Sequence, residues 1–280
     1  MARVTQRETK DGAVIKKTNR YANIIEHIFH SRYKAGARLV DFKREDIVSV
    51  ANELGIQLPK NLGDVIYSFR YRAALPDTIR ATAPNGEVWV IRPSGRALYQ
   101  FALVADAPIS PSLNLGETKL PDATPGIVLM YSGNDEQALL AKLRYNRLVD
   151  IFTGVTSYSL QNHLRTTVPS MGQIETDEIY VGIDHRGSHY VFPVQAKGGN
   201  DRMNIVQIEQ DIALCQAKFP NLICIAIGAQ FISNDKIALF AFEESEQGVV
   251  IVQEKHYRLT MPDQITHEEL QNYRNRPKSM

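Results

Sequence analysis

Apolar and polar residues recur with a helical period through the first third of the chain. Three segments place apolar side chains on one helical face, which predicts helices from about residues 20, 42 and 61. Gly55 is placed to end the second helix, and Asn61 can cap the third. Asn85-Gly86 then separates two alternating runs, a strong signal for a β-hairpin turn. The apolar positions are Tyr21, Ile24, Ile25, Ile28 and Phe29, then Ile47, Val48, Ala51 and Leu54, then Leu62, Val65, Ile66 and Phe69.

Strands and helices alternate from residue 126 onward. An apolar strand is predicted at 126–131, followed by a helix at 136–152 that Asn134-Asp135 can cap. Strands at 177–183 and 189–196 flank a polar turn, which predicts a second hairpin. The remaining predicted elements are a helix at 203–218 and strands at 222–228, 236–242 and 248–258. This order predicts a mixed α/β core with helices on both faces of a sheet.

The segment between these two regions has a different character. Residues 105–125 contain four prolines and little periodicity, so we expect a linker or a strap across the surface. The predicted domains are therefore residues 18–104 and residues 126–260. The polar ends of the chain, residues 1–17 and 264–280, are expected to be loosely held.

Composition places the chain among water-soluble globular proteins, with 44% hydrophobic and 22% charged residues. No apolar run approaches the roughly 20 residues that a membrane-spanning helix needs. The polar N-terminus lacks the apolar core of a secretory signal, and Cys215 and Cys224 are consistent with reduced, buried thiols. We therefore expect a cytoplasmic protein with no membrane contact.

Charge is distributed unevenly along the chain. Residues 1–100 hold 17 basic and 10 acidic side chains, whereas the rest of the chain holds 15 basic and 21 acidic ones. A basic N-terminal region suggests an anionic partner. An acidic C-terminal region can supply carboxylates for a metal ion.

The N-terminal order of helix, helix, turn, helix and hairpin is that of a winged helix-turn-helix domain. In such a domain the third helix enters the major groove of duplex DNA, and basic residues contact phosphates. The expected DNA-binding residues near the third helix and the hairpin are Lys60, Ser68, Arg70, Tyr71, Arg72, Arg80 and Arg92. The alternative is a small α+β domain whose arginines are merely solvated at its surface.

A carboxylate, an amide and a lysine lie at the open end of the second predicted hairpin, away from its turn. Asp177 opens the first strand, whereas Gln195 and Lys197 end the second and share one of its faces. Pairing of the two strands would bring Asp177 beside Lys197. Phosphodiester hydrolysis with Mg²⁺ needs few protein ligands, and a nearby lysine can position the attacking water and oppose the developing charge.

This segment resembles the core of the PD-(D/E)XK nuclease superfamily. ThrAspGlu stands where the family usually has Pro-Asp, and GlnAlaLys stands where it usually has Glu-x-Lys. The resemblance covers about residues 126–245 and implies that Asp177 is the main Mg²⁺ ligand, with Mn²⁺ able to substitute. It implies that Lys197 is the catalytic lysine and places Gln195 at the second motif position. The implied fold class is α/β (α+β), with a winged helix-turn-helix domain and a restriction-endonuclease-like mixed-sheet core flanked by helices.

Gln195 departs from the usual family pattern. An amide oxygen can ligate a metal ion but adds no negative charge, so we expect another carboxylate to supply it. Glu175 would share the face of Asp177 and is a further candidate metal ligand. Glu136 matches the position from which the family often contributes a catalytic glutamate, although acids are favoured in the first turn of any helix. Asp150 and Glu209, on flanking helices, are weaker candidates.

The resemblance implies a Mg²⁺-dependent type II restriction endonuclease of a prokaryotic cytoplasm that cuts double-stranded DNA at a specific sequence. We expect a homodimer, because two copies most easily cut both strands of a symmetric site. Gln207 and Gln210 are candidate DNA contacts, with ordinary helix solvation as the alternative. Two other functions stay open: a structure-specific repair or recombination nuclease, and a non-catalytic winged-helix regulator.

Overall fold

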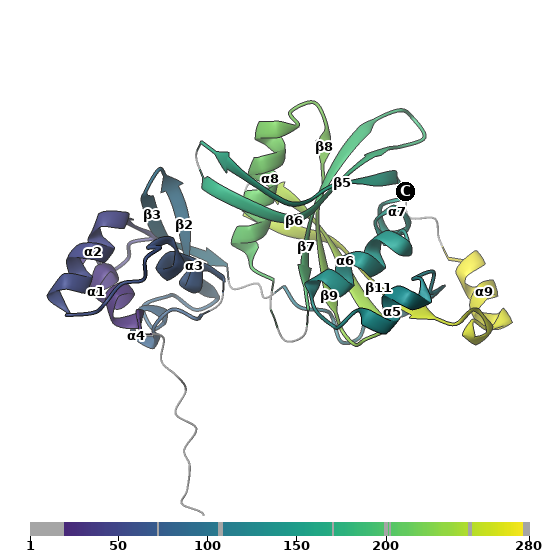
Figure 1. Cartoon of the computed structure of the whole chain (residues 1–280), viewed down its shortest axis with the longest axis horizontal. Helices are drawn as coiled ribbons and strands as arrows, with labels where there is room; N and C mark the ends of the chain where they lie inside the picture. Colours follow the sequence, from purple (N-terminus) through teal and green to yellow (C-terminus); the bar gives the residue numbers. More distant parts are fainter. Residues whose placement is uncertain are drawn as a thin grey trace, which may run out of the picture.

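The described residues form two separate sheets flanked by helices, which makes this a mixed α/β protein (Figure 1). The computed structural model describes residues 20–276, apart from residues 72, 106–108, 170, 199–200, 202 and 246–247. We call residues 20–105 the N-terminal domain and residues 109–276 the C-terminal domain. The expected N-terminal tail, residues 1–17, lies outside the described residues.

The N-terminal domain packs short helices against an antiparallel sheet with the strand order β1-β3-β2. Phe29 lies at the centre of its core, with ring centroids 5.1 Å from both Trp89 and Phe101 in edge-on contacts. Asn61, expected to cap the third helix, lies two residues before its first residue, and its side-chain oxygen accepts from the Gly63 N–H at 3.1 Å in the turn that leads into the helix. The elements are α1 (Ala22–Arg32), β1 (Leu39–Lys43), α2 (Arg44–Glu53), α3 (Gly63–Tyr71), α4 (Asp77–Arg80), β2 (Glu87–Gly95) and β3 (Leu98–Ala105).

The hairpin predicted at Asn85-Gly86 is wrong. Residues 77–80 form helix α4 instead of a strand, because Pro76 starts a helical turn and Ile79 is fully buried in the core. The observed hairpin joins β2 to β3, and Ala97 in its turn has a φ of 60°. Strand β1, which completes the sheet, was not predicted.

The C-terminal domain is built on a long mixed sheet with the strand order β4-β11-β10-β9-β7-β6-β5, and β8 also pairs with β7. Neighbours run antiparallel except for the parallel pairs β7–β9, β7–β8 and β11–β4. The strands are β4 (Glu117–Pro121), β5 (Thr156–Val168), β6 (Gly172–Ile183), β7 (His189–Lys197), β8 (Ile223–Cys224), β9 (Ala226–Phe231), β10 (Lys236–Ser245) and β11 (Gly248–Thr260).

Helices cover both faces of this sheet, as predicted. Helices α6 and α7 pack on one face through Leu139, Leu143 and Leu148. Helix α8 packs on the other through Ile208 and Leu214. The helical elements are α5 (Gly126–Tyr131), α6 (Glu136–Tyr145), α7 (Leu148–Thr153), α8 (Ile205–Lys218), the 3-10 turn η1 (Pro262–Gln264) and α9 (His267–Arg274).

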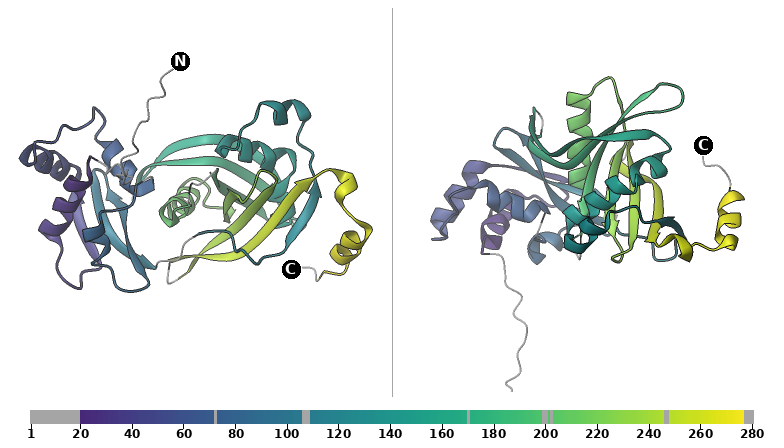
Figure 2. Two further views of the ribbon diagram at one scale, coloured as in Figure 1. Left: turned by 90° about the horizontal axis from the view of Figure 1, so that it is seen from below. Right: turned by 45° about the vertical axis from the view of Figure 1, so that its right-hand side comes forward.

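Three expectations for this region are wrong. The apolar segment 126–131 is helix α5 and not a strand, because β4 takes the edge position beside β11. The expected linker is therefore partly ordered within the sheet. Residues 267–274 form α9 instead of fraying, because Thr266 and Glu269 make a capping box. Seen from below, α9 and the N-terminal domain lie at opposite ends of the molecule (Figure 2).

No helix in the described residues is long and apolar enough to cross a membrane.

The two domains meet at helix α8. Its N-cap residue Asn204 donates from its side chain to the Arg70 carbonyl at 2.6 Å, and Arg92 of β2 forms an ion pair with Glu209. Burial raises the pKa of the Glu209 carboxyl, and the Arg92 guanidinium opposes that rise. The pair is therefore a partly desolvated contact that orients one domain on the other.

Reversing the charge of Arg92 tests this contact. Arg92→Glu should lower the free energy of unfolding by about 1–3 kcal/mol, because it leaves Glu209 without its buried partner. The double variant Arg92→Glu with Glu209→Arg should recover most of that loss in urea titrations. Arg80→Glu is the matched control, since Arg80 pairs with Asp77 in solvent and its change should cost less than about 1 kcal/mol. A double variant no more stable than Arg92→Glu would contradict the pairing.

Candidate active site

The sheet divides at one point between strands β6 and β7. The two strands pair from Glu178 opposite Val194 as far as Ile183 opposite His189. Before Glu178, strand β6 pairs with β5 alone, while β7 continues beside β9 up to Lys197. We call this divergence the fork. At the fork, backbone N–H and C=O groups that would have paired between β6 and β7 are available for hydrogen bonds with side chains.

Asp177 occupies the fork and replaces the missing ladder. Its Oδ2 accepts a hydrogen bond from the Ala196 N–H at 2.8 Å. The buried Gln195 side chain adds a longer contact, from its Nε2 to the Glu175 carbonyl at 3.4 Å, and Gln207 Nε2 lies 3.4 Å from Gln195 Oε1. The acid and the amide predicted as a pair thus both take part in contacts that cross from β7 to β6 at the fork.

Lys197 reaches the beginning of helix α6. Its Nζ lies 2.8 Å from Glu136 Oε1, and only 11% of the lysine side chain is exposed. The chain approaches this helix closely, because a Cβ on Gly198 would lie 2.8 Å from the Asn134 carbonyl oxygen. Asp135 caps the helix by accepting from the Ala138 N–H at 2.9 Å. The expected residues Asp177, Gln195, Lys197 and Glu136 therefore converge at the fork.

The electrostatics of the fork favour a cation. Burial raises the pKa of the Asp177 carboxyl, the Ala196 N–H and the Lys197 ammonium oppose the rise, and Glu136 adds to it. Lys197 is shared between two carboxylates and cannot neutralise both. A divalent cation beside Asp177 would relieve this excess negative charge.

A buried carboxyl group that was not predicted lies beneath the fork. Asp211 of α8 is fully buried, and its Oδ1 accepts from the Thr176 hydroxyl at 2.5 Å. Its Oδ2 has no hydrogen-bond partner among the described residues. Burial raises the pKa of Asp211 to about 8, against the effects of Thr176 and Gln195. Its position on the apolar face of α8, between Ile208 and Cys215, was the available signal in the sequence.

Glu175 lies away from the expected metal position. Its carboxylate is 3.1 Å from the Arg165 guanidinium and 3.9 Å from His163 Nδ1. Its main-chain carbonyl, by contrast, faces Gln195. The weaker candidate acids are also engaged, since Asp150 pairs with Arg147 and Glu209 with Arg92. The neighbouring Glu178 pairs with Arg144.

The expected DNA-binding residues fall into two groups. Lys60 and Arg80 are exposed, and Ser68 is half-buried. Arg70, Arg92 and Gln207 lie at the contact between the domains or at the fork, and Gln210 is buried on α8. The side chain of Tyr71 and all of Arg72 lie outside the described residues. DNA contact by these residues stays a prediction.

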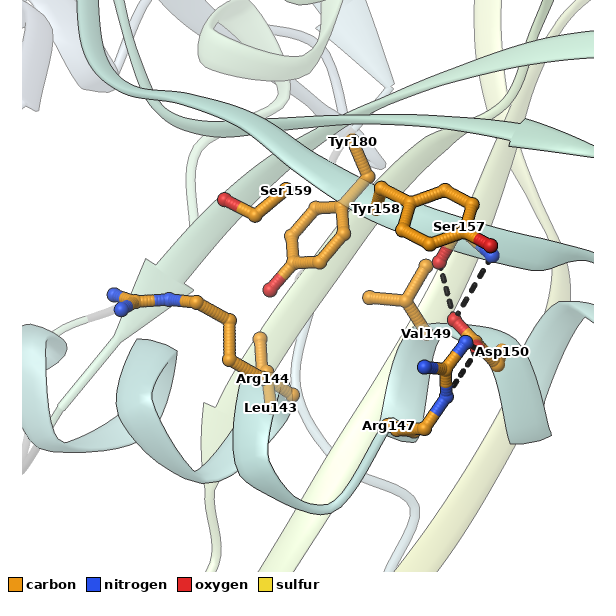
Figure 3. Close-up of a pocket in the computed structure, with 9 residues that line it drawn as sticks. All are labelled: Leu143, Arg144, Arg147, Val149, Asp150, Ser157, Tyr158, Ser159 and Tyr180. Carbon is orange, nitrogen blue, oxygen red and sulfur yellow. Dashed lines mark hydrogen bonds and ion pairs between the residues drawn. The ribbon is translucent and has the colours of Figure 1, made fainter.

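Away from the fork, a polar cavity lies between α6, α7 and the strands β5 and β6 (Figure 3). Its charged side chains are already paired: Arg147 binds Asp150, which also accepts from the Ser157 N–H at 3.2 Å, and Arg144 binds the buried Glu178. Its lining includes none of the residues that converge at the fork. We therefore place the candidate active site at the fork.

Comparison with known proteins does not identify the chain, because no family model, curated protein sequence or solved structure matches it. Within the described residues, no group of three or more His, Cys, Asp or Glu side chains is arranged to hold a metal ion. Mg²⁺ does not require such a group, since it binds through one or two carboxylates and keeps several waters. Asp177 fits that requirement through the carboxylate oxygen that does not bond Ala196, and Asp211 Oδ2 fits it on condition that the cation displaces the Asp211 proton.

Replacing Asp211 should change how stability depends on pH. The folded chain keeps a proton on Asp211 up to about pH 8, whereas the unfolded chain releases it near pH 4. The free energy of unfolding should therefore fall as pH rises through this window, by up to about 1.4 kcal/mol per pH unit. Asp211→Asn should lack this decline and should be more stable than wild type at about pH 8 in urea titrations. Asp41→Asn, at an exposed position, should follow wild type; parallel curves for wild type and Asp211→Asn would be inconsistent with a protonated Asp211.

Proposed function

We propose that the chain is a Mg²⁺-dependent endonuclease that hydrolyses phosphodiester bonds of double-stranded DNA. The proposal is carried by the convergence of Asp177 and Lys197 at the fork, with Glu136 on the lysine and Gln195 beside the acid. This acid, hairpin and lysine arrangement lies in a mixed sheet with helices on both faces, which supports the resemblance to PD-(D/E)XK nucleases. Bound Mg²⁺ would act as a Lewis acid and activate water for attack.

The side chains at the fork have separable roles in this proposal. Asp177 would hold the cation through its carboxylate, one oxygen of which accepts from the Ala196 N–H. Gln195 would offer a neutral oxygen, and Asp211 would supply the missing negative charge once cation binding displaced the proton that burial holds on it. Lys197, oriented by Glu136, directs an N–H at the attacking water and at the developing charge on the phosphate.

The N-terminal domain is the proposed DNA-recognition module. Its order of helix, strand, two helices, the short helix α4 and a hairpin is compatible with a winged helix-turn-helix, and its exposed Lys60 and Arg80 suit phosphate contacts. Arg92 instead forms an ion pair with Glu209 of α8, and this pairing favours a role for Arg92 in orienting the domains. A type II restriction enzyme that acts as a homodimer on a symmetric sequence is the form of nuclease we favour.

Substitution at the fork tests catalysis directly. Asp177→Asn and Lys197→Met should each slow nicking of supercoiled plasmid in Mg²⁺ by at least about 100-fold, because each removes a group that stabilises charge in the transition state. DNA affinity, measured by gel shift in Ca²⁺, should change little. Lys142→Met is the control, since this lysine of α6 bonds the Asn234 carbonyl and not the fork.

The products of cleavage separate the rival functions. Discrete plasmid fragments support a sequence-specific enzyme, whereas preference for branched DNA would mean a repair or recombination nuclease. DNA binding by wild type with no nicking in either Mg²⁺ or Mn²⁺ would refute the nuclease proposal and leave a regulator.

Moving the negative charge tests the role of Asp211. Asp211→Asn should raise the Mg²⁺ concentration required for half-maximal cleavage by about tenfold, the size of effect expected for a lost metal-site contact. Gln195→Glu combined with Asp211→Asn returns one carboxylate to the site and should recover much of that loss. Failure of this double variant, while its fold and DNA affinity persist, would show that Asp211 does not compensate for Gln195.

A further inference from the structure

His163 has an unusual backbone for a residue within a strand. Its φ is 47°, in the left-handed region, although it lies inside β5. An L-residue adopts this conformation only at a cost in free energy, whereas glycine adopts it freely. Asn162 pairs with Glu178 and Leu164 with Thr176, so His163 lies opposite Asp177.

The imidazole of His163 joins the elements that form the fork. Its Nε2 lies 2.9 Å from Gln137 Nε2, on the residue that follows Glu136 in α6. Because an amide nitrogen donates and does not accept, Nε2 is the acceptor and Nδ1 carries the hydrogen. Glu175 Oε1 is 3.9 Å from Nδ1, too far for a hydrogen bond, so Nδ1–H remains available among the described residues.

Packing does not explain this strained residue. The side chain is 52% exposed, and it belongs to none of the apolar clusters of the described core. Its neighbours are the polar side chains of Gln137 and Glu175, and it lies near enough to Asp177 to affect that carboxyl electrostatically. Strained residues tend to occur at functional sites, where a particular side-chain position is needed.

We propose that His163 is an additional catalytic residue whose Nδ1–H donates a hydrogen bond to the scissile phosphate. The proposal rests on the nuclease function proposed above. In the strand order β5 and β7 lie on either side of β6, and His163 and Lys197 contact the consecutive α6 residues Gln137 and Glu136. Phosphoryl transfer spreads negative charge over the phosphate oxygens, so a second donor near Lys197 would stabilise that charge further. Such a donor is preorganised, because Gln137 fixes the tautomer and the backbone fixes the ring.

The variant His163→Gly tests the catalytic role without disturbing the fold. His163→Gly should fold with unchanged or higher thermal stability, because glycine removes the backbone strain. It should slow plasmid cleavage by about 100-fold, the usual cost of losing one preorganised donor. DNA affinity in Ca²⁺ should remain within about twofold of wild type, because this hydrogen bond acts mainly in the transition state.

Free imidazole provides the decisive readout. Because the site is half-exposed, imidazole at millimolar concentration should enter it and restore at least about tenfold of the activity lost in His163→Gly. Imidazole should not restore Asp177→Asn or Lys197→Met, and His185→Asn, at an exposed position in the β6–β7 turn, should cleave like wild type.

Each result decides one of the two proposals. Wild-type activity in His163→Gly, or lost activity that imidazole does not restore in the folded variant, would overturn the role of His163 and leave the nuclease intact. An inactive wild-type protein would refute the nuclease proposal, and the role of His163 with it.

Discussion

The hydrogen bond from the Ala196 N–H to Asp177 holds the candidate site together. This bond lies where β6 and β7 separate. It satisfies the Ala196 N–H, which has no partner on β6 in the ladder, and it fixes the position of the Asp177 carboxylate. The same divergence directs Gln195 inward and lets Lys197 reach Glu136 on α6. A continuous ladder between the strands would have used these backbone groups for structure and left no polar opening. In the proposed nuclease, this interruption of the sheet is where the catalytic side chains would meet.

Helix α8 links this site to the N-terminal domain. Within about two turns, Asn204 and Glu209 bind the N-terminal domain, whereas Gln207 and Asp211 face Gln195 and Thr176 at the fork. An interaction that shifts α8 where it contacts the N-terminal domain would therefore also move the polar side chains that α8 places at the fork. In the proposed nuclease, this helix is the physical route by which DNA bound to one domain would affect cleavage by the other.

Local structure was predicted well from the sequence wherever the apolar residues followed a single helical or alternating period. The apolar face of α1 and the hairpin of β6 and β7 followed directly from helical and alternating patterns. Prediction failed where tertiary contacts decided the outcome. The apolar segment 126–131 has strand-like composition, yet β4 holds the edge of the sheet, and Asn85-Gly86 follows a short helix instead of joining two strands. Asp177 and Lys197 were found because their spacing encodes a hairpin. Asp211 and His163 were missed because they come near Asp177 from elements distant in sequence.

Crystals soaked in Mn²⁺ would test the central claim most directly, since anomalous scattering locates this ion without ambiguity. The account predicts one Mn²⁺ coordinated directly by the Asp177 carboxylate, with Asp211 deprotonated and turned toward the ion or its waters. An Asp177 carboxylate that remains without a metal ion at saturating Mn²⁺, in crystals that also contain bound DNA, would contradict it.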